Sequence, residues 1–173
     1  MVIINTNMEN RESNTILLVE DDPNDVLLIK RAFLKSNIIN PIQVVDNGEE
    51  AIYYLAARGN FKNRRQFPLP VLILLDLKLP RKSGHEVLEW LNQQPCLKRI
   101  PVIVLTSSQQ SLDINRAYDL GANSYLVKPV TFDNLLALMN NVKSYWLLLN
   151  EHARLLDEPG FTNGTFYSRL SVD

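Results

Sequence analysis

The chain has 173 residues, a formal net charge of −1 and a single cysteine, Cys96. This length suits one domain with a well-buried core, and the near-neutral charge gives no electrostatic reason to expect nucleic acid or an acidic membrane as a partner. One cysteine excludes an internal disulfide and fits a reducing compartment. The first residues lack the basic start and apolar run of a secretory signal, and no segment approaches the roughly 20 apolar residues of a membrane span, so we expect a soluble, cytoplasmic protein.

Short apolar runs recur five times along the chain and predict strands buried in a parallel sheet. They occupy residues 15–19, 42–45, 71–75, 101–105 and 124–127. Segments with helical periodicity lie between them, so we expect an α/β fold with helices on both faces of the sheet. The flavodoxin-like (βα)5 doubly wound parallel sheet, with strand order 2-1-3-4-5, places the first and third strands side by side.

The predicted helices carry their own start signals. Asp22 and Pro23 suit the N-cap and first position of the first helix, and Ser83 with Glu86 forms a capping-box pattern at the third. The other helices are predicted at DNGEEAIYYLAAR, from about residue 110 to 120, and from Thr131 onward.

The alternating elements fill residues 15–150, which we predict to form one domain. Residues 1–14 are then an N-terminal extension. Residues 151–173 are a C-terminal extension that contains the helix-breaking pair Pro159–Gly160 and that we predict to be mobile.

The stretch VLILLDLKLPRKSG ends an aliphatic run on a carboxylate, Asp76. Such a group is costly without partners, and ligand sites form at the carboxyl ends of strands in open parallel sheets. Glu20 and Asp21 follow the first strand and would lie beside Asp76, whereas Asp22 is explained as a helix cap. Carboxylates packed together repel one another unless a cation joins them, and their oxygens suit Mg²⁺. We therefore expect a magnesium site at this edge.

Two more strands end in groups that suit the same edge, a hydroxyl at Thr106 and an ammonium at Lys128. Each alone has an ordinary explanation as a helix cap or a solvated lysine. Together with the carboxylates they suit phosphoryl transfer, in which a protein mainly positions groups and neutralises oxygens. Asp76 would be the nucleophile that forms an acyl phosphate, with magnesium, Lys128 and Thr106 each contacting a phosphoryl oxygen.

The motifs ILLVEDDPND, LILLDLKLPRKSG, VIVLTSS and YLVKP closely resemble, in order and spacing, the receiver domain of two-component response regulators. The resemblance implies that Asp76 is the phosphoacceptor. It also implies that Asp21, Asp76 and the backbone carbonyl of Lys78 bind magnesium, with Glu20 helping through a water. Such a protein is not an enzyme with a separate substrate, because it catalyses only its own phosphorylation and dephosphorylation.

The same resemblance assigns the switch that follows phosphorylation. Thr106 would be the switch hydroxyl, Tyr125 the aromatic residue that rotates with it, and Lys128 the lysine that contacts the phosphoryl group. The Lys128–Pro129 peptide bond is often cis in this family, which would aim the lysine into the site.

A finer resemblance, through LLVEDDPNDVLLIKRAF, LLDLKLPRKSGHEVL and AYDLGANSYLVKPV, is to the stand-alone receivers that serve cyanobacterial phytochromes. It implies a stand-alone response regulator that is phosphorylated by a partner histidine kinase of phytochrome type. Signalling would run through phosphorylation-dependent contacts with an unknown downstream protein. The alternative is a receiver of another pathway, of motility or chemotaxis type, or a phosphorelay intermediate.

Other classes fit these residues less well. A phosphatase of the haloacid-dehalogenase type needs an aspartate where this chain has Lys78, and a flavodoxin-like cofactor binder needs a phosphate loop where it has EDDPND. The residues after the fifth helix are too few for a DNA-binding module, so no DNA partner is expected. Neither His85 nor His152 lies in a recognisable phosphodonor helix. We place His85 in the exposed first turn of the third helix and His152 on the surface after the fifth.

The fifth helix carries more apolar residues than one face can hold. The predicted core stripe is Leu135, Leu138, Val142, Tyr145 or Trp146, and Leu149. The residues that cannot all share that face are Phe132, Leu136, Met139, Tyr145, Trp146, Leu147 and Leu148. Surplus apolar surface of this kind marks an interaction site. We expect a homodimer through this helix, a region through which related stand-alone receivers pair, unless the residues from 151 onward cover it.

Overall fold

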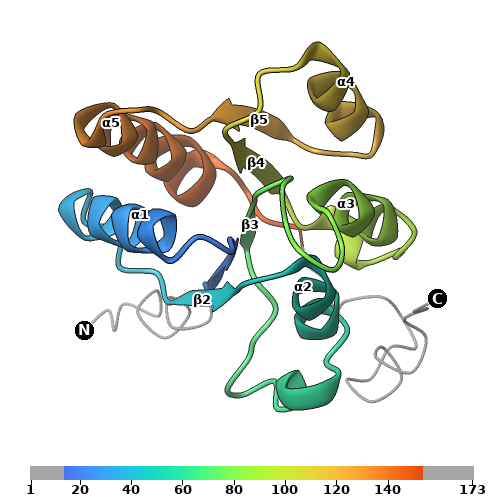
Figure 1. Ribbon diagram of the computed structural model, residues 1–173. Coiled ribbons are helices and arrows are strands. Elements are labelled where there is room, and N and C mark those ends of the chain that lie inside the picture. The colour runs from blue at the N-terminus through green and yellow to red at the C-terminus, as the bar shows by residue number, and fades with distance from the viewer. Residues whose placement is uncertain (1–13, 154–173) are drawn as a thin grey trace, which may run out of the picture.

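A computed structural model describes residues 14–153 and shows five parallel strands in one sheet (Figure 1). The strands are β1 Ile16–Val19, β2 Ile42–Val45, β3 Leu72–Leu75, β4 Val102–Thr106 and β5 Ser124–Val127. Their order is β2-β1-β3-β4-β5, which confirms the predicted order. The predicted extensions lie almost entirely outside the described residues.

Helices cover both faces of the sheet, as expected for parallel strands (Figure 1). One face carries α1 Pro23–Lys35 and α5 Phe132–Val142, and the other carries α2 Gly48–Leu55, α3 Gly84–Asn92 and α4 Ser111–Asp119. Short 3₁₀ turns occupy Gly59–Phe61 and Leu97–Arg99. Within residues 14–153, every helix is too short or too polar to cross a bilayer.

Alternating side chains of the central strands build two cores, one under each helix layer. In β1, Ile16 and Leu18 pack toward α1 and α5, while Leu17 and Val19 pack toward α2 and α3. The same alternation runs through β3 and β4, whose side chains are buried on both faces. These strands are uniformly apolar because a period of two sends successive residues into two different cores.

The predicted start signals of α1 and α3 are present. Asp22 caps α1 by accepting a hydrogen bond from the backbone N–H of Asn24 at 2.8 Å. Ser83 and Glu86 form a complete capping box at α3. These caps are short-range, so the sequence was sufficient to locate them.

The fifth helix departs from the predicted stripe. It continues past Val142 as a π-helical segment, Lys143–Leu149. Its i→i+5 hydrogen bonds widen the turn and change the phase of the side chains. Leu149, predicted in the core, is therefore 74% exposed. Met139, predicted as surplus, lies before this segment and is fully buried, because it stands at α-helical spacing between the buried Leu135 and Val142.

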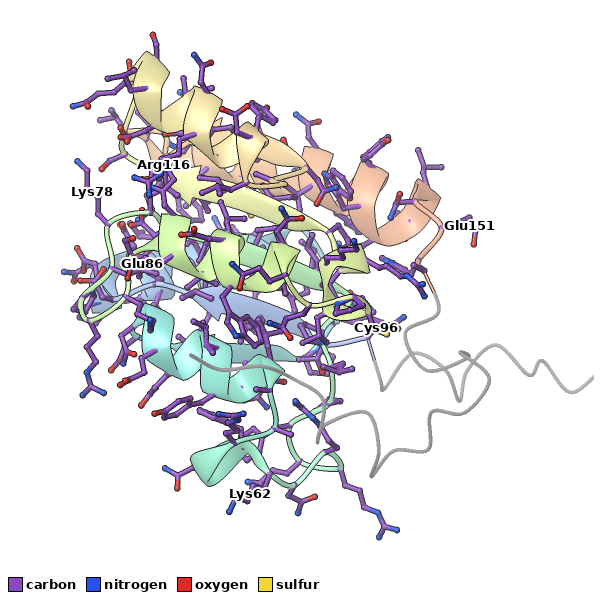
Figure 2. All side chains as sticks on the ribbon, turned by 90° about the vertical axis from the view of Figure 1, so that its right-hand side faces the viewer. Lys62, Lys78, Glu86, Cys96, Arg116 and Glu151 are labelled. Atoms are coloured by element: carbon purple, nitrogen blue, oxygen red, sulfur yellow. The ribbon has the colours of Figure 1, made fainter. Side chains whose placement is uncertain are left out.

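Cys96 is a buried, unpaired thiol before the second 3₁₀ turn. Figure 2 shows it at the end of the domain opposite Lys78, which follows β3. The thiol is therefore remote from the carboxyl edge of the sheet.

The β3–α3 loop depends on the absence of a side chain at Gly84. A Cβ there would meet the carbonyl oxygen of Asp76 and would lie 2.7 Å from the Cα of Leu77. We expect Gly84→Ala to lower the free energy of unfolding by about 1–3 kcal/mol, because the loop must shift. The backbone amide NMR signals of Asp76 and Leu77 should move with it.

Gly59→Ala is the matched control for this change. Gly59 has a φ of +56°, but its nearest contact would be an ordinary one, 3.8 Å from Tyr53. It should cost about 1–2 kcal/mol of backbone strain and leave the Asp76 and Leu77 signals in place. Unchanged signals in Gly84→Ala would contradict the close approach.

Candidate functional site

Asp76 follows β3 directly and is buried at the carboxyl edge of the sheet. Its backbone N–H donates to the carbonyl of Val19 at 3.0 Å, so β1 and β3 are still paired at this level. Its Oδ1 accepts hydrogen bonds from the N–H groups of Leu77 at 2.6 Å and Lys78 at 3.3 Å. The carboxylate is thus held by the backbone of its own loop.

Three carboxylates meet at this edge. Glu20, Asp21 and Asp76 each offer an oxygen, and the three oxygens lie within 4.8 Å of one another. Glu20 is 2% exposed, while Asp21 is open to solvent. An all-oxygen set with one solvent-facing member fits a hard divalent cation that retains waters. Asp22 lies outside this group as the cap of α1, as predicted.

Lys128 supplies the positive charge of the site. Its Nζ lies 2.6 Å from Glu20 Oε2, 2.7 Å from Asp25 Oδ2 and 2.9 Å from Asp76 Oδ2. Burial by itself would lower the pKa of Lys128, but the hydrogen bonds to Asp25, Glu20 and Asp76 outweigh it and raise the pKa above its ordinary value. The ammonium therefore stays charged.

The two buried carboxylates respond to this environment in opposite directions. Burial raises the pKa of Glu20 to about 7, and the hydrogen bond from Lys128 offsets only part of that effect. Burial also acts to raise the pKa of Asp76, but hydrogen bonds from Thr106 and Lys128 prevail and hold it below its ordinary value. Asp76 is therefore the carboxylate that stays ionised at neutral pH, as a nucleophile requires.

Thr106 and Tyr125 lie in the strands predicted for them, β4 and β5. Thr106 is the fully buried last residue of β4, and its carbonyl accepts the backbone N–H of Lys128 at 2.8 Å. Tyr125 is half-buried in β5, and its hydroxyl donates to the carbonyl of Ser108 at 3.1 Å. A hydrogen-bonded path thus leads from the β4–α4 loop to β5, the region predicted to switch.

The predicted exposure of His85 is wrong. The side chain is buried, and its Nε2 lies 3.3 Å from the carbonyl oxygen of Asp113 in α4. The Asp113 carboxylate in turn accepts a hydrogen bond from the Ser108 hydroxyl. Helix α4 packs over the start of α3, and this contact between distant segments is invisible in the local pattern.

The Lys128–Pro129 peptide bond is trans, contrary to the expectation from the resemblance. The lysine nevertheless reaches Asp76, because β5 is in parallel register with β4 and its end is level with Thr106. Sequence reasoning also missed Asp25, which contacts Lys128 from α1, and Gly84 under the Asp76 loop. The acidic first turn of α1 was the available signal for Asp25.

Comparison with known proteins gives one family. The model of the response regulator receiver domain family matches residues 16–140. Response regulator Rcp1 of Synechocystis sp. is 39% identical over 80% of this chain and 92% of its own length. The probable methanogenesis regulatory protein FilR2 of Methanothrix harundinacea is likewise 39% identical, over 81% of this chain and 88% of its own length.

Solved structures agree with this result. The crystal structure of the phosphorylated cyanobacterial phytochrome response regulator RcpA aligns with a TM-score of 0.76 and 38% identity, over 82% of this chain and 99% of that one. The structure of the Mn²⁺-bound form of Rcp1 aligns with a TM-score of 0.74 and 37% identity, over the same shares of the two chains.

The raised pKa of Glu20 predicts how stability changes with pH. Between its ordinary value of 4.5 and about 7, the folded state holds a proton that the unfolded state has released. Glu20 therefore adds stability below pH 4.5, and this contribution is lost as pH rises through 7. Replacing it by a neutral amide, in Glu20→Gln, should remove a fall of about 2–3 kcal/mol between pH 5 and pH 8 in metal-free buffer.

Urea unfolding followed by tryptophan fluorescence at several pH values measures this effect. Glu89→Gln, which removes an exposed carboxylate of α3, is the matched control and should keep the wild-type slope. The lowered pKa of Asp76 acts at lower pH, outside this range. Parallel stability curves for the wild type and Glu20→Gln would show that Glu20 is ionised in the folded protein throughout.

Proposed function

The chain belongs to the response regulator receiver domain family, and on that basis we propose that it is a stand-alone, cytoplasmic response regulator phosphorylated on Asp76 by a partner histidine kinase. The family is one of signalling proteins. In this role the chain acts on no separate substrate. It catalyses only its own phosphorylation and dephosphorylation, and it signals through protein contacts that depend on the phosphoryl group.

One observation carries this proposal: a carboxylate held ionised at a strand end, with two further carboxylates, an ammonium and a hydroxyl around it. In the transfer, an oxygen of Asp76 forms a bond to phosphorus while the bond from phosphorus to the donor nitrogen breaks. Lys128 contacts one phosphoryl oxygen and Thr106 another. The end of β3 and two backbone N–H groups fix the position of Asp76, which supports this role.

Magnesium is the cofactor we propose for this site. Asp21, Asp76 and the carbonyl of Lys78 would hold it, with Glu20 contributing through a water. When bound, it supplies positive charge to the phosphoryl oxygens. The oxygen-only donor set supports a hard cation, and the relative Rcp1 has been solved in a Mn²⁺-bound form.

The partner kinase we propose is of phytochrome type. The similarity to RcpA, a phytochrome response regulator, supports this assignment. The similar identity to FilR2, a probable methanogenesis regulator, keeps a receiver of another pathway as the alternative. Phosphoryl transfer rates from a purified phytochrome-type kinase and from an unrelated histidine kinase distinguish the two.

The output we propose is a shift between two packings of the α4–β5–α5 side of the domain. When Asp76 is phosphorylated, Thr106 moves toward the phosphoryl oxygens and Tyr125 follows. Tyr125 is bonded to the carbonyl of Ser108, two residues beyond Thr106, which supports mechanical coupling between them. The downstream protein would bind one packing better than the other.

We also propose a homodimer through the end of the fifth helix. The π-helical segment Lys143–Leu149 leaves Tyr145, Leu148 and Leu149 more than half exposed, and apolar surface of this kind favours association. A twofold pairing is the commonest closed form. Trp146 packs against the core between the sheet and α1 and α5, so it is the poorer choice for a test of the interface.

With magnesium and acetyl phosphate, the wild type should gain one hydroxylamine-labile phosphate, and Asp76→Asn should gain none. Intact-mass spectrometry and Phos-tag electrophoresis measure the uptake. Asp21→Asn should lose most of the uptake and the magnesium dependence, whereas Asp22→Asn should keep both, since it preserves the cap. Uptake at the wild-type rate by Asp76→Asn would contradict the phosphoacceptor assignment.

Leu148→Asp should raise the dimer dissociation constant about fivefold or more, because it places a charge in the apolar contact. Leu148 is 66% exposed, so the fold should tolerate the change. Leu112→Asp is the control, since Leu112 is 81% exposed on α4, away from this segment. Sedimentation of the full chain at micromolar concentration measures the dimer dissociation constant of each variant. A monomeric wild type would overturn the proposed dimer.

A further inference from the structure

Asp25 is a fourth carboxylate at the site with no part in the group of three. It is the third residue of α1, and its Oδ2 lies 2.7 Å from the ammonium of Lys128. It does not cap α1, because Asp22 does. Nor does it belong to Glu20, Asp21 and Asp76, the group that could hold a cation. Its described contact is with the lysine alone.

The ammonium of Lys128 has three N–H donors, and three carboxylates surround it. Glu20, Asp25 and Asp76 each lie within 2.9 Å of Nζ. A phosphoryl oxygen arriving at Asp76 therefore finds no free donor on this lysine. One of the three carboxylates must give up its hydrogen bond.

Asp25 is the carboxylate that can be released at least cost. The Glu20 side chain is 2% exposed, so water cannot take the place of its hydrogen bond from Lys128. The Asp25 side chain is 34% exposed, beside a small surface hollow that it lines with Leu28 and Pro129, so water can replace the lysine. The lysine thus exchanges Asp25 for the phosphoryl oxygen.

The negative charge of Asp25 also sets it in competition with a phosphoryl group. The site holds four carboxyl groups and one ammonium, that of Lys128, and a phosphoryl group adds further negative charge. The carboxyl groups are those of Glu20, Asp21, Asp25 and Asp76. Two of the other carboxylates can share a cation with the phosphoryl oxygens, but Asp25 has only the lysine. It competes with the incoming group for the same positive charge.

We propose that Asp25 is a positioning residue that holds the ammonium of Lys128 on the α1 side and competes for it with the phosphoryl group, so that it slows phosphoryl uptake by Asp76. This inference rests on the proposed phosphorylation of Asp76. Its consequence is that the rate of uptake is set partly by a residue that never touches the phosphoryl group.

The test compares phosphoryl uptake from acetyl phosphate, with saturating magnesium, in charge-matched variants. Asp25→Asn keeps the shape and removes the charge, and should take up phosphate about twofold to fivefold faster, the range expected for losing a partly exposed ion pair. Beryllium fluoride, a tetrahedral phosphoryl analogue, should bind more tightly by a similar factor. Asp25→Glu, which keeps the charge, should stay close to the wild type.

Asp22→Asn is the control for a general charge effect, since Asp22 lies three residues away on the same turn and does not contact Lys128. It should leave the uptake rate unchanged. If Asp25→Asn does not fold, as judged from its amide NMR spectrum, Asp25→Ala replaces it. Equal acceleration by Asp22→Asn and Asp25→Asn would overturn the specific role of Asp25.

A double-mutant cycle shows whether Asp25 acts through the lysine. In the Lys128→Gln background, Asp25→Asn should change neither the residual uptake nor the beryllium fluoride affinity. The same acceleration in both backgrounds, or slower uptake in Asp25→Asn alone, would overturn the inference. A wild type that takes up no phosphate on Asp76 would overturn the proposed function with it, whereas normal uptake with inert Asp25 variants would overturn this inference only.

Discussion

The ion cluster at the carboxyl edge of the sheet is the contact on which the rest of the site depends. Two carboxylates, Glu20 and Asp76, are buried there, and a buried charge is costly unless it is paired and hydrogen-bonded. Lys128 pairs with both. It follows β5, an edge strand of the sheet, and lies more than 100 residues after Glu20 in the chain. The site is therefore incomplete until β5 has joined β4.

The parallel register explains why these groups face one another. Leu18 and Leu74 point toward α1 and α5, and Leu126 packs on the same side. Glu20, Asp76 and Lys128 each stand two residues further on, so the period of two sends them to that side as well. Asp25 of α1 lies on the same face, whereas Tyr125 packs toward the other core. The alternation of side chains thus places the ion cluster and Tyr125 on opposite sides of the sheet, while Thr106 hydrogen-bonds Asp76.

The backbone around Asp76 is as constrained as its side chain. Leu77 and Lys78 donate their N–H groups to the carboxylate, and α3 begins so close beneath the loop that only glycine fits at position 84. As the proposed phosphoacceptor, Asp76 pays little to reach a reactive geometry, since its orientation is fixed beforehand. Asp21 is the exposed member of the cluster, so the three carboxylates meet at the surface of the domain.

The sequence alone determined what depends on neighbours along the chain. The apolar runs gave five strands, Asp22 and Ser83 gave helix starts, and the strand ends at Asp76, Thr106 and Lys128 gave members of the candidate site, since each rests on a local pattern. The order of the strands followed from their alternation with helices and the general topology of doubly wound sheets. The tertiary structure decided the rest. His85 is buried because α4 packs on it, Leu149 is exposed because π-helical turns change the phase of the fifth helix, and Asp25 meets Lys128 because α1 and the end of β5 lie on one face. These contacts join segments far apart in the chain, so no local pattern contains them.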